Sequence, residues 1–139
     1  MISSLTNQGK LRFMIYEGAL KAPIFLNFLQ RLIREAACKL FVIVDNLPVH
    51  RAHRVTHRVT AWVQDNADRI ELFYLPSYAP EHNPDEFLNN DLKQAMARRR
   101  TPRDKAALKS GLISYMRSLQ HCPAKVRAFF QAPSVRYAA

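Results

Sequence analysis

The sequence predicts one α/β domain in which a mixed sheet is flanked by helices. Its 139 residues, 48% of them apolar, suffice for one hydrophobic core but not for two domains of ordinary size. Short apolar runs alternate with segments in which apolar residues recur at helical spacing. The expected order is strand, strand, helix, strand, helix, strand, helix, which indicates right-handed crossovers between the later strands. The domain is expected to cover residues 1–139, with its core over about 1–100 and C-terminal helices over about 103–131.

A hairpin and a helix are expected first. Residues 2–6 and the alternating segment 11–16 flank Asn7-Gln8-Gly9, in which Gly9 can adopt the positive φ of a tight turn. Pro23 is well placed in the first turn of a helix that carries its apolar side chains on one face.

Two strands are expected in the middle of the chain, at 40–44 and 70–75, with a helix over about 52–66 between them. The first strand reads LFVIV, a continuous apolar run that is typical of a central strand covered on both faces. The second is also expected to be buried.

Three helices are expected after these strands. They cover about 85–99, about 103–119, and a short segment opened by Pro123. Leu108 is expected on the inward apolar stripe of the second of these helices. The tail, 131–139, is expected to be frayed or draped on the surface.

The charge balance points to a polyanionic partner. Lys and Arg outnumber Asp and Glu by 21 to 11, which gives a net charge of +10 and a pI near 10.1. Nucleic acid is the first candidate, an acidic membrane surface is less common, and a basic protein without a dedicated partner is the alternative. No segment approaches the roughly 18 apolar residues of a membrane helix, so no membrane association is expected. Cys38 and Cys122 are isolated, which favours neither a zinc site nor a disulfide framework.

Two carboxylates occupy the ends of apolar elements. Asp45 ends the strand at 40–44, and Glu86 lies in the first turn of the helix that follows the next strand. Side chains at the carboxyl ends of strands converge on one crevice, and two carboxylates brought together there repel unless a cation lies between them. A Mg²⁺ site is therefore one interpretation. The other gives each residue a local role, Asp45 in an Asx turn and Glu86 as a carboxylate favoured by the helix dipole.

The segments VDNLPVH (44–50) and YLPSYAPEHNPDEFLNNDLK (74–93) resemble the catalytic core of DDE-type transposases of bacterial insertion sequences, within the Tc/mariner superfamily. The resemblance spans essentially the whole chain. It implies a ribonuclease H-like (retroviral integrase-like) fold, and cleavage and strand transfer of DNA that depend on Mg²⁺ or Mn²⁺. It also implies a bacterial cytoplasmic location at the nucleoid, with transposon ends and target DNA as partners.

The same resemblance assigns the site. Asp45 corresponds to the second catalytic carboxylate and metal ligand, and Glu86 to the third, because the Asn-Pro-x-Glu pattern selects Glu86 over the nearby Glu81 and Asp85. Glu86 follows Asp45 by 41 positions, somewhat more than is usual in the superfamily, and a helix and loops fill the interval.

The family's first strand and its catalytic Asp have no counterpart here, because the earliest acid, Glu17, follows the hairpin. The family's N-terminal helix-turn-helix domain is also absent. That first strand would lie between the hairpin and the strand ending at Asp45, so its loss would leave backbone groups unpaired. We therefore expect the downstream part of a split or truncated transposase, first strand missing and inactive alone, that is either completed by an upstream-encoded fragment or left as a remnant. A second copy of the chain, forming a homodimer, is a further expected partner.

Cations and polar residues near the two motifs are candidate DNA contacts. Asn46 and His50 follow Asp45, although a His after a Pro turn is as often a solvated or packing residue. The basic residues follow the second motif, where a solvated helix end is the competing interpretation. They are Lys93, Arg98, Arg99, Arg100, Arg103, Lys105 and Lys109. A non-catalytic DNA-binding remnant is the alternative function, and the Asn-Pro-x-Glu pattern disfavours a ribonuclease or junction nuclease of the same fold.

Overall fold

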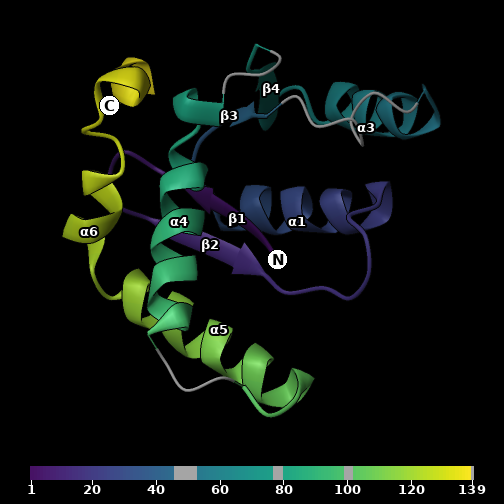
Figure 1. The fold of residues 1–139 in the computed structure, drawn as a ribbon. Helices are drawn as coiled ribbons and strands as arrows, with labels where there is room; N and C mark the ends of the chain where they lie inside the picture. The colour runs from purple at the N-terminus through teal and green to yellow at the C-terminus, as the bar shows by residue number, and fades with distance from the viewer. Residues whose placement is uncertain (46–52, 77–79, 99–101, 139) are drawn as a thin grey trace. The chain divides into compact units, whose positions relative to one another are not determined.

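The chain divides into two units in the computed structural model, which describes residues 1–45, 53–76, 80–98 and 102–138. The first unit combines both ends of the chain, Met1–Ile15 and Pro80–Ala139, and the second is the middle, Tyr16–Ala79. Strands and helices of both units appear in Figure 1. Elements of the first unit are β1 (Ile2–Leu5), β2 (Leu11–Met14), the 3-10 helix η1 (Pro80–His82), α4 (Pro84–Ala97), α5 (Lys105–Gln120), α6 (Pro123–Ala128) and the 3-10 helix η2 (Pro133–Ala138).

The expected hairpin is confirmed. β1 and β2 pair antiparallel with Ile2 opposite Met14 and Leu5 opposite Leu11. Gly9 has φ +89° in the connecting turn, and a Cβ placed there would lie 2.6 Å from the carbonyl oxygen of Pro123. The turn therefore packs against the first residue of α6, where only glycine fits.

The core of the first unit lies where α4, α5 and α6 pack on the hairpin (Figure 1). Its buried members are Leu11, Leu88, Leu92, Tyr115, Met116, Leu119 and Val126. The Gln120 side chain donates to the carbonyl oxygen of Leu11 at 2.9 Å, which ties the end of α5 to β2. Ala95 and Met96 of α4 pack against this core as well, so the apolar residues of α4 form one inward stripe.

The second unit contains a parallel strand pair and two helices. Its elements are α1 (Ala22–Glu35), β3 (Leu40–Val44), α3 (His53–Asp65) and β4 (Ile70–Tyr74). β3 and β4 run parallel, in register from Leu40 opposite Ile70 to Val44 opposite Tyr74. α1 packs on α3, and α3 on β4, so the apolar face predicted for α1 is confirmed as buried at Phe25, Phe28 and Leu29.

The expectation that the strand at 40–44 is covered on both faces is wrong, and so is full burial of the next strand. Phe41 is 66% exposed and Ile43 44%, and Phe73 on β4 is 47% exposed. These residues share one face, because Ile43 lies opposite Phe73 in the register. An unbroken apolar run cannot distinguish a strand covered on one face from one covered on both.

One expectation for the C-terminal third is corrected and another is decided. Leu108 is 41% exposed instead of buried, because α5 begins at Lys105 and its first turns extend beyond the core. Of the two alternatives for the tail, the structure supports a segment lying on the surface and not a frayed one, because residues 133–138 form η2 and Val135 within it is fully buried. A single buried valine in a short polar segment gives no periodic signal.

Candidate functional site

The first turn of α4 is built by the Asn-Pro-x-Glu segment itself. Asn83 is the N-cap, and its side-chain oxygen accepts a hydrogen bond from the backbone N–H of Asp85 at 3.0 Å. Pro84 occupies the first helical position, where its fixed φ suits the helix and its missing N–H costs nothing. Asp85 and Glu86 then lie in the turn where the helix dipole favours negative charge.

Asp85 is committed to holding this turn in place. Its Oδ1 accepts a 2.6 Å hydrogen bond from the Ser3 hydroxyl on β1, and its Oδ2 accepts from the Asn89 side chain at 3.4 Å. The carboxylate thus links α4 to the hairpin. It has a structural task that explains its presence beside Glu86.

Glu86 is placed differently. Its backbone N–H donates to the carbonyl oxygen of Asn83 at 3.0 Å, so its Cα position is fixed by the cap. Its side chain is half-buried and has no hydrogen-bond or ion-pair partner among the residues that the structure describes. The backbone of Glu86 is therefore fixed, while its carboxylate makes no contact with the described residues.

Asp45 directly follows β3 in the second unit and is half-buried. The backbone N–H of Leu75 donates to the carbonyl oxygen of Val44 at 2.9 Å, which continues the parallel pairing to the last residue of β3. Asp45 thus lies at the carboxyl edge of a parallel pair, as the sequence predicts. Asn46 and His50 lie outside the described residues.

The two predicted carboxylates belong to different units, Asp45 to the second and Glu86 to the first. Each unit defines the position of its own carboxylate. Across residues 1–45, 53–76, 80–98 and 102–138, no three His, Cys, Asp or Glu side chains gather closely enough to hold a metal ion. Pairing of Asp45 with Glu86 stays a prediction.

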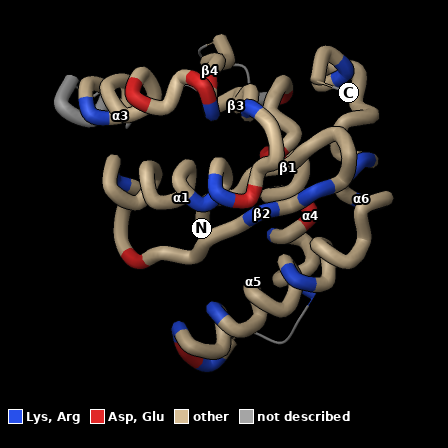
Figure 2. The backbone as a smooth tube through the Cα atoms, turned by 180° about the vertical axis from the view of Figure 1, so that it is seen from behind, with Lys and Arg blue, Asp and Glu red and all other residues tan. Residues whose placement is uncertain are grey.

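The predicted basic residues that are described lie on the surface. Lys93 and Arg98 are exposed on α4 and at its C-terminal end, and Arg103 is exposed just before α5. Figure 2 shows Lys and Arg gathered at the tip where α5 begins. Asp104 among them caps α5, with its Oδ1 accepting from the backbone N–H of Ala107 at 2.7 Å. Arg99 and Arg100 lie outside the described residues.

Comparison with protein families decides what kind of domain this is. The family model described as DDE superfamily endonuclease matches residues 1–109, more than three quarters of the chain. The chain belongs to the DDE superfamily of endonucleases. No curated protein and no solved structure matches it.

The match places both predicted carboxylates and the basic residues up to Lys109 inside the DDE endonuclease region. Most of α5 and all of α6 and η2 follow the matched residues. Nucleases of this superfamily act on DNA and generally use divalent metal ions such as Mg²⁺. In the described part of the DDE endonuclease chain, no helix is long and apolar enough to cross a membrane.

The structure also reveals a cluster that the sequence did not indicate. Asp91 on α4 accepts hydrogen bonds from the Tyr115 hydroxyl on α5 and from the Lys125 ammonium on α6. Burial works to raise the pKa of the Asp91 carboxyl, but these two bonds and the positive charges of Lys125 and Arg98 outweigh it and hold the pKa below its usual value. Burial and the bond to Asp91 raise the pKa of Tyr115 far above its ordinary value. Only the topology brings these three helices together, so spacing along the chain could not have indicated the cluster.

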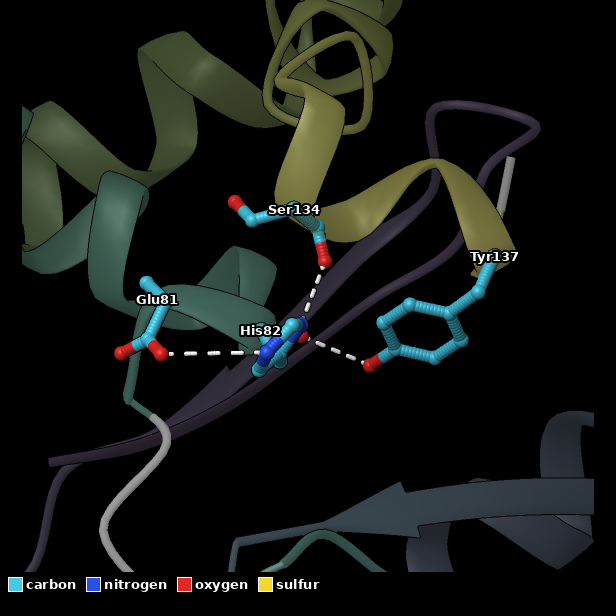
Figure 3. Close-up of polar contacts among 4 residues, drawn as sticks. All are labelled: Glu81, His82, Ser134 and Tyr137. Carbon is cyan, nitrogen blue, oxygen red and sulfur yellow. Dashed lines mark hydrogen bonds and ion pairs between the residues drawn. The ribbon is translucent and has the colours of Figure 1, made fainter.

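A second missed residue is His82, immediately before the cap of α4. Its ring contacts η2, more than fifty positions later in the chain (Figure 3). The motif spacing drew attention to the carboxylates and gave no sign of this contact.

Proposed function

We propose that the chain is the catalytic portion of a DDE transposase, and that it acts in metal-dependent cleavage and strand transfer of DNA. Superfamily membership supports the nuclease chemistry. The motifs at 44–50 and 74–93 support the finer assignment to an insertion-sequence element of the Tc/mariner type with a ribonuclease H-like fold.

The proposal rests on a difference in bonding between two adjacent carboxylates on α4. Asp85 is bonded to Ser3 and Asn89, whereas the Glu86 side chain has no partner in the described part of the chain. No described protein group therefore competes with a cation for the Glu86 carboxylate. Glu86 is therefore the acid of this turn that is available to bind a cation.

The donor set fits a hard divalent cation. Asp45 and Glu86 both offer carboxylate oxygens, the ligands that Mg²⁺ and Mn²⁺ take in proteins. When bound, such ions activate a water or hydroxyl and stabilise charge on the attacking and leaving oxygens of a phosphodiester. The chain's own part is to fix Glu86 through the α4 cap, to present Asp45 at the edge of the β3–β4 pair, and to hold the DNA backbone with exposed Lys93, Arg98 and Arg103.

A cleavage assay tests the proposal. The chain is purified, and nicking of DNA carrying the element's ends is measured with and without Mg²⁺. Glu86→Gln and Asp45→Asn should each reduce cleavage by at least about 10- to 100-fold, the range seen for residues that merely support a metal ligand. Glu81→Gln, an exposed carboxylate in the same motif, is the matched control and should retain activity. Unchanged cleavage by Glu86→Gln would refute the assignment.

A non-catalytic DNA-binding remnant is the alternative, and the exposed cations around the start of α5 favour it independently of the carboxylates. The same preparation separates the two functions. DNA binding that is unaffected by Mg²⁺ and by Glu86→Gln, with no cleavage, would indicate the remnant.

A further inference from the structure

The turn η1 leads directly into the N-cap of α4. His82 is its last residue, and the next residue, Asn83, caps the helix that carries Glu86. Whatever fixes the backbone of His82 therefore fixes the start of α4.

Two hydrogen bonds of opposite direction join His82 to η2 (Figure 3). The ring Nδ1 lies 2.8 Å from the carbonyl oxygen of Ser134, and the Tyr137 hydroxyl donates to the carbonyl oxygen of His82 at 2.7 Å. A carbonyl oxygen can only accept, so the ring carries a hydrogen on Nδ1. Because this nitrogen is protonated in both the neutral and the cationic ring, the bond does not depend on the charge of His82.

An apolar anchor lies between the two bonded residues of η2. Val135 is fully buried, so the segment is seated on the unit and not only tethered by polar contacts. Partial burial raises the pKa of the Tyr137 hydroxyl, which keeps it protonated and able to donate at neutral pH. An ion pair with Glu81 adds little to the attachment of His82, because the Glu81 side chain is 60% exposed and its Oε1 lies 3.7 Å from His82 Nε2.

The first turn of α4 is thus held from two sides. Ser3 of β1 holds it through Asp85, and η2 holds the residue before its cap through His82. Neither contact uses the Glu86 side chain. Such an arrangement fixes the backbone of a metal-binding residue while leaving its carboxylate available. A metal site needs its ligands held to within about 0.5 Å of the binding geometry.

We propose that η2 is a strap that positions the first turn of α4, and that His82 and Tyr137 are positioning residues for Glu86. The role of Glu86 rests on the proposed function, whereas the strap does not. The family model matches residues 1–109, so the strap at 133–138 lies outside the matched region.

Tyr137→Phe tests the strap, because it removes one hydroxyl and keeps the ring. Hydrogen–deuterium exchange of the amides at 83–88 should become about 2- to 10-fold faster, as expected for the loss of one hydrogen bond. Exchange in α5 and α6 should not change. Tyr16→Phe is the matched control, since the Tyr16 hydroxyl has no hydrogen bond with the described part of the chain. Unchanged exchange at 83–88, or an equal increase in all three helices, would overturn the strap.

A second measurement tests positioning apart from stability. Mn²⁺ is titrated into the preparation used for cleavage and followed by electron paramagnetic resonance. Tyr137→Phe should weaken Mn²⁺ binding by a similar 2- to 10-fold, with a Tm within about 5 °C of the parent. Parent-like Mn²⁺ affinity alongside faster exchange would overturn the positioning role. If the parent binds no Mn²⁺, the proposed function fails, while exchange alone still decides the strap.

Discussion

The Ser3 hydroxyl donates a 2.6 Å hydrogen bond to Asp85 Oδ1 and thereby joins residues 82 positions apart in the chain. This bond holds β1 against the first turn of α4. The Asp85 carboxylate thereby serves the fold, whereas the side chain of the adjacent Glu86 has no bond with the described part of the chain.

Ser3→Ala should lower the free energy of unfolding by about 1–3 kcal/mol, because it leaves a half-buried carboxylate with one partner fewer. Urea denaturation measures the change. Ser4→Ala is the control, since Ser4 points to the other face of the strand and has no side-chain bond in the described part of the chain. Its effect should stay within about 0.5 kcal/mol. Equal losses in the two variants would contradict the role given to Ser3.

Gly9→Ala should be among the most damaging substitutions in the hairpin. It combines the strain of a positive φ, about 1–2 kcal/mol, with a Cβ only 2.6 Å from the Pro123 oxygen. Gly18→Ala separates the two effects, because Gly18 has φ +75° but no atom within 4 Å of an added Cβ. Denaturation should show a clearly larger loss for Gly9→Ala. If the two losses match, the packing of the turn on Pro123 contributes nothing.

Asp91→Asn should make stability less dependent on acid pH. The pKa of Asp91 is lower in the folded chain than in the unfolded one, where it is about 3.9, so the folded state binds fewer protons. Its contribution is therefore present above that value and is lost as pH falls through the folded pKa. Unfolding free energies at pH 7 and pH 3 should differ less in the variant than in the parent. Asp68→Asn, an exposed turn residue, should leave the difference unchanged.

Neutralising Arg98 and Arg103 should weaken DNA binding in a salt-dependent way. If each contacts one phosphate, Arg98→Gln/Arg103→Gln should lower the slope of log affinity against log salt by about 2. Fluorescence anisotropy over a KCl series measures the slope. The control is Arg31→Gln/Arg34→Gln, which removes the same charge from the exposed face of α1. An equal decrease in both double variants would indicate a general effect of net charge.

The sequence predicted the elements well where local signals are strong. Gly9 marked the hairpin turn, and the apolar spacing of α4 indicated its buried stripe. The motif spacing also placed Glu86 in the first turn of a helix and Asp45 after a strand. Each of these inferences depends on residues within a few positions of one another.

The missed features depend on contacts between distant segments. Phe41 lies in a continuous apolar run, and such a run is the same whether this face of the strand is covered or exposed. Val135 stands alone as an apolar anchor in η2, and the partner of His82 lies 52 positions away. Asp91 similarly depends on Tyr115 and Lys125 from two later helices. Such contacts leave no periodic pattern in one sequence.

The first unit is assembled from both ends of the chain, with the middle unit, Tyr16–Ala79, inserted between them. During translation, at roughly 5–20 residues per second, the β1–β2 hairpin leaves the ribosome several seconds before α4, α5 and α6 exist. A lone hairpin is marginal in water, so it must wait with its apolar face uncovered. The middle unit can form meanwhile, and the unit that carries Glu86 is completed only after α4, α5 and α6 have been made.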